Sequence, residues 1–361
     1  MDHIEIISKF DIGERITECR PYGEGHINST FLATAENGKK YLLQALNTDV
    51  FRNPDGVMEN IAAVGAHLMA KESDSRRVMT VIPNKEGGYL YRAEGKTWRV
   101  LNFIEDSLCL QLPESEADVY ECGFAFGDFQ RRLADLDASL LCDTIPDFHN
   151  TPKRYAALLS AEKNDICGRA DGVRAELEFI KSRERLISVL ADAHEKGVLP
   201  LRVTHNDTKI NNVLLDKCTR KALCVIDLDT VMPGFSVNDF GDGIRTSAAT
   251  AAEDERDLTK VHFDIALYKA YARGFAEGCG GGLTNEELRL MPEGAMLMTL
   301  ECGMRFLTDY LSGDTYFRTE YAEHNLVRCR TQLKMLAEME EKLPEMRAAV
   351  EAGIKAADKR Q

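Results

Sequence analysis

The stretch VTHNDTKINNVLLDKCTRKALCVIDLD, Val203–Asp229, carries the most informative pattern in this chain. Two short apolar runs, Val213–Leu215 and Leu223–Ile226, flank a polar turn at 216–221, and this pattern predicts a β-hairpin. The polar loop 205–212 precedes the first run, and an aspartate follows the second run directly. We therefore expect the hairpin to present carboxylates and amides at one edge.

His205, Asp207 and Asn212 fit the pattern H-x-D-x-x-x-x-N, which is typical of the catalytic loop of protein-kinase-like phosphotransferases. Asp207 is the candidate base for an acceptor hydroxyl. Asn212 and Asp227 are the candidate Mg²⁺ ligands, because Mg²⁺ prefers oxygen. Asp229 is a further candidate only if the strand breaks there, since alternate residues of a strand face opposite sides. The alternative is that these residues merely cap turns.

Composition limits the partners of the 361-residue chain. A formal net charge of −14 argues against nucleic acid or an anionic membrane as the main partner. It also means that a polyphosphate ligand needs local help from metal, Lys, Arg or backbone N–H groups. The cysteines lack C-x-x-C spacing, the N-terminus does not read as a signal peptide, and no apolar run approaches transmembrane length. We expect a cytoplasmic protein that binds small molecules.

The first hundred residues read as a β-rich unit with one main helix. Strands are predicted at 16–20, 29–35, 41–46, 78–82, 89–93 and 97–104, and a helix starts at Asn53-Pro54. After Glu105-Asp106 the pattern becomes helical, at 114–136, 153–159, 173–194, 268–278, 294–311 and from 323. We predict an α+β, two-lobed protein-kinase-like fold, with a nucleotide-binding lobe over 1–104 and a catalytic, acceptor-binding lobe over 105–361.

The predicted nucleotide site begins at the turn Gly23-Glu24-Gly25-His26-Ile27-Asn28, whose backbone N–H groups can cover phosphates. Asn28 stands where a kinase-type loop has its third glycine. Gln44 stands where the third strand of a kinase carries a phosphate-binding lysine, so the balance of phosphate charge is left open. Glu59 of the following helix is expected on the solvated surface. Backbone groups from Asn102 to Ile104 are expected to meet adenine.

Asp239-Phe240-Gly241 spells the tripeptide that marks the metal aspartate of protein kinases. We assign the metal to Asp227 instead, because Asp227 ends the second strand of the hairpin that follows the catalytic loop. Asp239 and Asp242 are expected to accept hydrogen bonds from backbone N–H groups of that loop. Arg245 either pairs with one of them or forms an ordinary surface ion pair.

Polar residues also interrupt the largely apolar helix predicted at 294–311. Arg305 and Asp309 could pair along one helical face at i, i+4. Together with Tyr310 they could equally line an acceptor pocket, since polar groups on an apolar helix need partners.

The chain resembles the aminoglycoside phosphotransferase-like kinases, and within that family it is most similar to the bacterial N-acetylhexosamine 1-kinases. The resemblance covers nearly the whole chain. It depends on GEGHINSTF, LLQALNTDVF with NPDGVMENI, THNDTKINNVLLD, VIDLDTVMPG, DFGDGIR and RFLTDYLSGDTYF.

The resemblance implies that ATP and Mg²⁺ bind in the cleft between the lobes. The implied acceptor is the anomeric hydroxyl of N-acetylglucosamine or N-acetylgalactosamine, which gives the sugar 1-phosphate. Asp207 carries over as base, Asn212 and Asp227 carry over as metal ligands, and Arg305 carries over as a sugar contact. His26 and Asn28 are implied to close over the substrate or the phosphates.

Two alternatives remain open at this stage. The acceptor could be an aminoglycoside, choline, homoserine or a simple hexose, with the same kinase chemistry. The chain could also be a non-catalytic nucleotide-binding protein, because Gln44 and the incomplete glycine loop depart from the kinase pattern.

Overall fold

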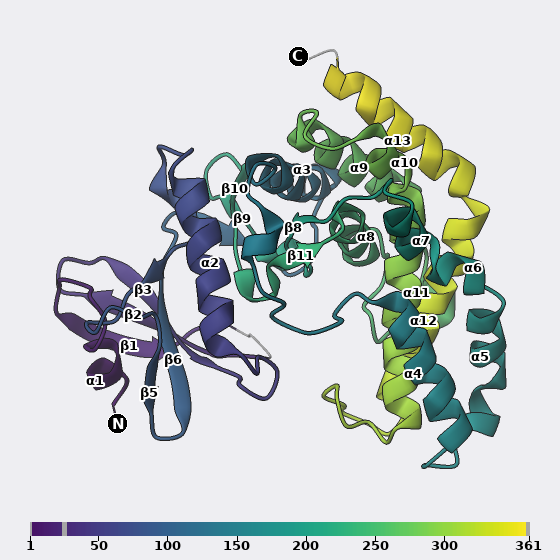
Figure 1. Ribbon diagram of the computed structural model, residues 1–361, viewed down its shortest axis with the longest axis horizontal. Helices are drawn as coiled ribbons and strands as arrows, with labels where there is room; N and C mark the ends of the chain where they lie inside the picture. Colours follow the sequence, from purple (N-terminus) through teal and green to yellow (C-terminus); the bar gives the residue numbers. More distant parts are fainter. Residues whose placement is uncertain (1, 24–26, 359–361) are drawn as a thin grey trace.

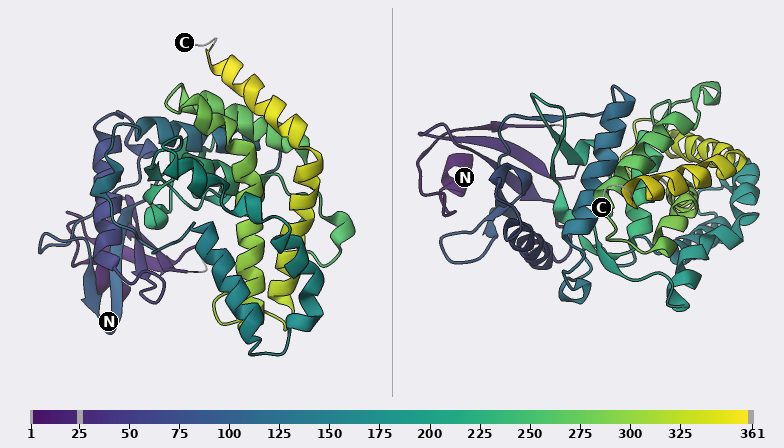
Figure 2. Two further views of the ribbon diagram at one scale, coloured as in Figure 1. Left: turned by 45° about the vertical axis from the view of Figure 1, so that its right-hand side comes forward. Right: turned by 90° about the horizontal axis from the view of Figure 1, so that it is seen from above.

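The structure is a computed structural model, and it describes residues 2–23 and 27–358. The chain forms two lobes, a β-rich N-terminal lobe and a larger helical C-terminal lobe (Figure 1). Both views of Figure 2 show the purple N-terminal sheet at one end of the molecule and the yellow C-terminal helices in the other lobe. The predicted two-lobed α+β fold is confirmed.

The N-terminal lobe is built on an antiparallel sheet in the order β1-β2-β3-β6-β4, with β5 paired to β6. The turn Asn37-Gly38, a residue pair that favours tight hairpins, lies between β2 and β3, where Gly38 adopts a φ of 86°. The bounds are α1 His3–Ile7, β1 Ile16–Pro21, β2 Ser29–Ala35, β3 Lys40–Leu46, α2 Pro54–Met69, β4 Val81–Ile82, β5 Tyr91–Ala93 and β6 Lys96–Asn102.

Helix α2 begins as its sequence predicts. The side chain of Asn53 caps the helix by accepting a hydrogen bond from Gly56 N, and Pro54 occupies the first helical position. Its apolar stripe is buried, whereas Glu59 is exposed. The exposure of Glu59 confirms that this carboxylate belongs to the solvated surface.

The C-terminal lobe carries two small sheets beneath the cleft. The first has the order β10-β9-β7 and contains the predicted hairpin, and the second pairs β8 with β11. The bounds are β7 Ser107–Cys109, β8 Arg202–Thr204, β9 Val213–Asp216, β10 Ala222–Val225 and β11 Met232–Gly234. Since β7 follows the end of β6 so closely, the chain passes from one lobe to the other within a few residues.

The helices of this lobe are α3 Glu116–Arg132, α4 Thr151–Asn164, α5 Arg174–Lys181, α6 Glu184–Ile187, α7 Val189–Glu195, α8 Ser236–Ser247, α9 Ile265–Cys279, α10 Asn285–Arg289, α11 Met291–Leu311, α12 His324–Glu341 and α13 Leu343–Asp358. The single helix predicted at 173–194 was wrong, because α5, α6 and α7 are separate. Serines 182 and 188 lie at the breaks, and the Ser182 hydroxyl donates to the Phe179 carbonyl at 2.8 Å. Such a local hydrogen bond competes with continuation of a helix.

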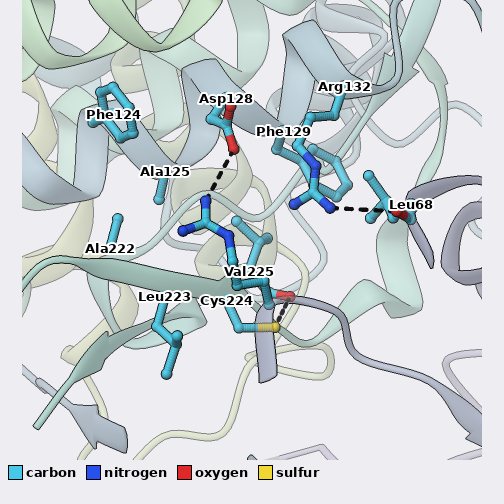
Figure 3. Close-up of a pocket in the computed structure, with 11 residues that line it drawn as sticks. Leu68, Phe124, Ala125, Asp128, Phe129, Arg132, Ala222, Leu223, Cys224 and Val225 are labelled. Carbon is cyan, nitrogen blue, oxygen red and sulfur yellow. Dashed lines mark hydrogen bonds and ion pairs between the residues drawn. The ribbon is translucent and has the colours of Figure 1, made fainter. Parts of the chain in front are cut away.

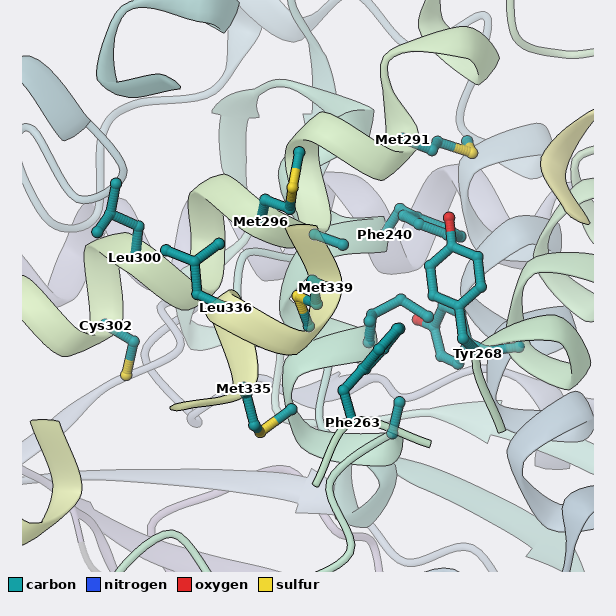
Figure 4. Close-up of a cluster of buried hydrophobic side chains, with 14 of the residues drawn as sticks. Phe240, Phe263, Tyr268, Met291, Met296, Leu300, Cys302, Met335, Leu336 and Met339 are labelled. Atoms are coloured by element: carbon teal, nitrogen blue, oxygen red, sulfur yellow. The ribbon is translucent and has the colours of Figure 1, made fainter. Parts of the chain in front are cut away.

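The main apolar core lies among the helices of the C-terminal lobe, where methionines of α11 and α12 meet the aromatic rings of Phe240, Phe263 and Tyr268 (Figure 4). A second core joins the lobes. It packs α2 and β6 against side chains of the other lobe, including Phe129, Leu214 and Val231. The shared core limits how far the lobes can separate without exposing apolar surface.

Helices α3 and α9 approach each other through glycines spaced one turn apart on both helices. A Cβ atom built on Gly127 would lie 2.2 Å from the carbonyl oxygen of Phe275, and one on Gly274 would lie 2.1 Å from that of Tyr120. These neighbours are backbone atoms, which cannot turn aside as a side chain can. Glycine is therefore required for this helix pair to pack.

We expect Gly127→Ala to destabilise the protein by about 3 kcal/mol, because an added methyl group must push α9 away from α3. The free energy of unfolding measured in urea checks this value. Gly172→Ala is the matched control, since its Cβ atom would meet nothing within 4 Å. An equal effect in both variants would contradict the close approach of the two helices.

Among the helices in the described part of the chain, none combines the length and apolar character that crossing a bilayer requires.

Candidate active site

The catalytic loop is held by the side chain of His205. This ring lies between the rings of Phe126 and Phe129, with centroids 5.3 and 5.9 Å away. Its Nε2 lies 2.9 Å from the Ile226 carbonyl oxygen, and its Nδ1 lies 3.2 Å from the backbone N of Asp207. Since Nε2 faces an acceptor and Nδ1 faces a donor, His205 is the neutral Nε2–H tautomer.

Two aspartates of helix α8 hold the same loop by hydrogen bonds to its backbone. Asp239 accepts hydrogen bonds from the backbone N–H groups of His205 at 2.8 Å and Asn206 at 2.7 Å, and Asp242 accepts from that of Thr208 at 2.9 Å. Burial raises the pKa of Asp239, but these donors favour its charged form. The predicted structural role of both aspartates is confirmed.

Arg245 forms a buried pair with Asp242 at 2.9 Å and a second pair with Glu253 at 2.7 Å. Its side chain is only 8% exposed, so the alternative of an ordinary surface ion pair was wrong. The guanidinium therefore reinforces the carboxylate that holds Thr208 and thus the shape of the catalytic loop.

Asp207 lies beside Lys209 and Asn212 in the loop. Its Oδ1 is 2.8 Å from Lys209 Nζ, and Asn212 Nδ2 donates to its Oδ2 at 3.2 Å and to its carbonyl oxygen at 2.8 Å. Burial raises the pKa of Asp207, but the charge and hydrogen bond of Lys209 lower it further, so the net pKa lies below its ordinary value. Asp207 is therefore ionised at neutral pH, and Lys209 is a site residue that the motif alone did not reveal.

Asp227 stands at the end of β10, where its φ of 59° breaks the strand. No described residue forms a hydrogen bond or ion pair with its carboxylate, which is exposed toward the cleft. Desolvation by the walls of the cleft is the largest cause that raises the pKa of Asp227, to about 7, and the negative charges of Asp229 and Asp207 come next. A carboxylate in this setting is stabilised by a cation, which fits the expected metal ligand.

The Asp229 carboxylate, in contrast to that of Asp227, is paired. Both of its oxygens bind Arg99, and Asn28 Nδ2 donates to its Oδ2 at 2.8 Å. Because the side chain is 4% exposed and its oxygens are occupied, Asp229 is a poor metal ligand even though the strand breaks beside it. The donors that remain for Mg²⁺ are an Asp227 oxygen and Asn212 Oδ1, which accepts no hydrogen bond from any described residue.

These groups line a cleft of about 400 Å³ between the lobes, a size that suits a small-molecule ligand. The cleft brings together the expected nucleotide-site residues Gly23, Asn28, Gln44, Asn102 and Ile104 with Asp207, Asn212 and Asp227. Gly25 and His26 lie outside the described residues. The side chain of Asn102 binds the segment 78–80, through Thr80 N at 2.8 Å and the Val78 carbonyl oxygen at 3.1 Å. Its backbone N–H also donates to the Thr80 carbonyl oxygen at 3.0 Å, so neither the side chain nor the backbone N–H of Asn102 is free to bind a ligand.

A second pocket, between the end of α2, α3 and β10, is not a ligand site (Figure 3). Its volume is about 20 Å³, little more than a water molecule requires. Its polar groups serve packing, since Arg77 pairs with Asp128 at 3.6 Å and Arg132 donates to the Leu68 carbonyl at 3.4 Å.

The three polar residues of α11 have different surroundings. Asp309 accepts from the backbone N–H groups of residues 315, 316 and 317 at 2.8–2.9 Å, so it shapes the following loop and neither pairs with Arg305 nor faces an acceptor. The ring of Tyr310 lies 4.5 Å from the Arg169 guanidinium. Arg305 forms no ion pair with a carboxylate of any described residue. Its guanidinium lies 5.3 Å from the ring of Phe148 and 5.5 Å from that of Phe317.

A buried His149–Glu301 pair connects α11 to the catalytic loop, and no motif pointed to it. His149 Nδ1 lies 2.8 Å from Glu301 Oε1, and Nε2 lies 3.1 Å from the carbonyl oxygen of Asn206, the neighbour of Asp207. Both partners are acceptors, so the ring donates from both nitrogens and is an imidazolium. Burial lowers the pKa of His149, but the charge and hydrogen bond of Glu301, together with the hydrogen bond to Asn206, raise the pKa overall.

This pair predicts a pH-dependent stability. A raised histidine pKa stabilises the fold fully below about pH 6.5, the unfolded pKa, and the gain is lost as pH rises through the folded value. We expect Glu301→Gln to destabilise the protein by about 3 kcal/mol near pH 6, because it leaves a buried charge unpaired. The difference from the wild type should narrow as the pH rises.

Urea unfolding of both proteins between pH 5.5 and pH 9 measures this difference. Glu116→Gln, at an exposed position, is the control and should follow the wild type at every pH. A constant gap between the wild type and Glu301→Gln would contradict the charged state of His149.

A sequence model of the phosphotransferase enzyme family (APH) matches residues 18–276. The fold is similar to that of an aminoglycoside phosphotransferase from Alicyclobacillus acidocaldarius, with 13% identity, a TM-score of 0.64, and coverage of 96% of this chain and 95% of that chain. A microcompartment-associated aminopropanol kinase has 16% identity, a TM-score of 0.63, and coverage of 95% and 97%. Spectinomycin phosphotransferase in complex with ADP and spectinomycin has 14% identity, a TM-score of 0.55, and coverage of 93% and 95%. At such identities the structures support the fold alone, whereas the sequence match spans the cleft and the catalytic loop. The chain therefore belongs to the phosphotransferase enzyme family.

Proposed function

We propose that this protein is an ATP- and Mg²⁺-dependent kinase that phosphorylates the anomeric hydroxyl of an N-acetylhexosamine, N-acetylglucosamine or N-acetylgalactosamine, to give the sugar 1-phosphate. The observation that carries the kinase chemistry is the juxtaposition of an ionised Asp207 with the unpaired carboxylate of Asp227 in one cleft. The similar spectinomycin phosphotransferase binds ADP, which supports a nucleotide in this cleft.

Asp207 acts on the acceptor in this proposal. Lys209 and Asn212 hold its carboxylate by contacts at 2.8 and 3.2 Å, so the acceptor hydroxyl can be oriented and its proton accepted at an Asp207 oxygen. Its lowered pKa makes it a weak base, which suits a reaction that asks mainly for positioning. Asp227 and Asn212 would hold Mg²⁺, which neutralises phosphate charge when bound.

The nucleotide is expected along the N-terminal side of the same cleft. In this proposal Gly23 and Asn28 meet the phosphates, and the hinge residues Asn102 and Ile104 meet adenine; all four residues line the cleft. No described residue forms a hydrogen bond with the backbone N–H of Ile104, so this group is available to a base. We propose a lobe boundary near residue 104, because the chain passes there from β6 of one lobe to β7 of the other. The free cysteines support a reducing compartment such as the cytoplasm.

The arginines near α11 support an uncharged, oxygen-rich acceptor. Arg305 lacks a carboxylate partner, and Arg154 likewise binds only the Phe148 carbonyl, at 3.0 Å, among the described residues. Neighbouring unpaired guanidinium groups disfavour a cationic amine and can donate to sugar hydroxyl or acetamido oxygens. An aromatic ring beside Arg305 suits the apolar face of a pyranose. The resemblance to the sugar 1-kinases provides the identity of the sugar.

The second candidate keeps the kinase chemistry but changes the acceptor to a small amino alcohol or an aminoglycoside. It is favoured by the similarity to the aminopropanol kinase and the spectinomycin phosphotransferase. The net charge of −14 is compatible with a cationic acceptor at long range. A non-catalytic role is less well supported, because Asp207, Asn212 and Asp227 all line one cleft.

An acceptor panel tests the proposal. Formation of ADP is followed with ATP, Mg²⁺ and each of N-acetylglucosamine, N-acetylgalactosamine, glucose, galactose, choline, homoserine and an aminoglycoside. We expect turnover with an N-acetylhexosamine and none with its methyl glycoside, in which the anomeric oxygen is blocked. ³¹P NMR of the product should show phosphate on C1. Turnover of an amine alone would support the second candidate.

A further inference from the structure

The third strand of the N-terminal lobe offers no cation to the cleft, since Gln44 stands on β3 where the lysine was expected. A cation reaches this place from the neighbouring strand. Arg99 on β6 is the direct cross-strand partner of Gln44, and it lines the cleft although the residue is only 1% exposed. A guanidinium buried to this extent must be paired, because an isolated buried charge is very costly.

The pairing of Arg99 joins the two lobes. Its Nη2 donates to Asp229 Oδ2 at 2.9 Å, and its Nη1 binds the other oxygen of the same carboxylate. Its Nε donates to Gln44 Oε1 at 2.9 Å. Planar two-point contact of this kind fixes both distance and angle, which a lysine ammonium cannot do.

Further residues of the N-terminal lobe support the Asp229 carboxylate, directly or through Arg99. Gln44 Nε2 donates to Thr30 Oγ1 at 3.0 Å, which orients the amide that receives Arg99. Asn28 donates to Asp229 at 2.8 Å, while its own Oδ1 accepts from Asn47 N at 3.0 Å. Residues of β2, β3, β6 and the glycine turn thus converge on one side chain of the other lobe.

Asp229 belongs to the short irregular segment that also carries Asp227, and α2 holds this segment from its other side. Asn60 Nδ2 donates at 2.8 Å to the carbonyl oxygens of both Val231 and Cys142. The segment Leu228–Thr230 is a single 3₁₀ turn, so a shift of Asp229 is transmitted directly to the residues beside it.

We propose that Arg99 is a positioning residue that acts through Asp229. It holds the Asp227 carboxylate at a defined place relative to the phosphate end of the cleft, and so replaces the positioning role, but not the free charge, of the missing strand lysine. The charge of Arg99 is matched by Asp229, so the pair adds little net attraction for phosphate. The inference depends on the proposed binding of nucleotide and Mg²⁺ in this cleft.

Arg99→Lys tests the proposal, because it keeps the charge but removes the two-point contact. Binding of the non-hydrolysable analogue AMP-PNP is measured by calorimetry at several Mg²⁺ concentrations, together with the melting temperature. We expect the Mg²⁺ dependence of binding to shift to about tenfold higher concentration, the scale of loss seen when support of a metal ligand is removed. Binding of AMP-PNP in EDTA should change much less.

Arg92→Lys is the matched control, since Arg92 lies on the adjacent strand β5 in an exposed pair with Asp55. It should bind AMP-PNP and Mg²⁺ as the wild type does. If Arg99→Lys does not fold, Gln44→Ala replaces it, because that variant removes the support of Arg99 Nε but keeps both contacts of Arg99 with Asp229, and it should give a smaller shift of the same kind.

The outcomes separate the two proposals. Wild-type protein that binds no AMP-PNP would overturn the proposed function itself. Wild-type binding with an unchanged Mg²⁺ dependence in Arg99→Lys, or in its substitute Gln44→Ala, would overturn the positioning role alone. A variant that loses binding equally with and without Mg²⁺ would also overturn it, since a general disturbance of the cleft does not distinguish the metal.

Discussion

Replacement of Asp207 by Asn is expected to lower kcat by about 10²–10⁴-fold, the usual contribution of a positioned general base. The amide preserves the shape of the side chain but cannot accept the proton of the acceptor hydroxyl. It also removes the ion pair with Lys209, whose pKa is raised chiefly by the Asp207 charge. Because Asp207 lies on the acceptor side of the phosphates in the proposed arrangement, nucleotide affinity should change little.

The measurement pairs steady-state kinetics with calorimetric binding of ADP and Mg²⁺. Asp171→Asn is the matched control, since the Asp171 side chain is 88% exposed and pairs with Arg174 on the surface. Unchanged turnover in Asp207→Asn would remove Asp207 from the proposed base role. A loss of turnover that is fully explained by lost nucleotide binding would do the same.

Replacement of Asp227 by Asn or Ala should abolish Mg²⁺-dependent turnover while the fold is retained. Its carboxylate bonds to no described residue, so its removal breaks no contact within the described chain. The two variants differ at the backbone, because Asp227 has a φ of 59°. Asn tolerates this conformation readily, whereas Ala adds about 1 kcal/mol of strain. Asp227→Asn is therefore the cleaner test.

The same substitution should raise stability above neutral pH. Burial in the cleft and the charges of Asp229 and Asp207 raise the folded pKa of Asp227 to about 7, above its unfolded value. An acid whose pKa rises on folding binds its proton more tightly in the native state. The wild type therefore loses stability as the pH increases from the unfolded pKa of Asp227 to its folded pKa of about 7. Asp227→Asn escapes this loss, and its melting temperature should exceed that of the wild type at pH 8 but not at pH 4.

Mg²⁺ distinguishes the two proteins in the same experiment. Added Mg²⁺ with ADP should raise the melting temperature of the wild type, because a ligand that binds only the native state stabilises it, and should raise that of Asp227→Asn much less. An equal shift in both proteins would show that another residue holds the metal.

The motif of the catalytic loop could be interpreted from the sequence because its information is local. The spacing of His205, Asp207 and Asn212 predicted one loop between two strands, and the apolar run before Asp227 favours that aspartate over Asp239 as the metal ligand. Cap and turn residues such as Asn53 and Gly38 act within their own segments, so their effects were also predictable. The amphipathic pattern at 173–194 was misleading, because the segment breaks at Ser182 and Ser188 where periodicity alone predicts one continuous helix.

The class of fold and the catalytic loop could be predicted from the sequence, because those features depend on neighbours a few residues apart, and the same local pattern predicts Asp227 as the metal aspartate. The partner that each polar side chain meets became known only from the packing of the folded chain. Arg99 and Asp229 are 130 residues apart, and His149 and Glu301 are 152 residues apart. Asp309 was predicted as a candidate substrate contact, but in the structure its carboxylate supports a loop. Such pairings follow from how helices and sheets pack, since burial forces each charged group to find a partner wherever the fold brings one near.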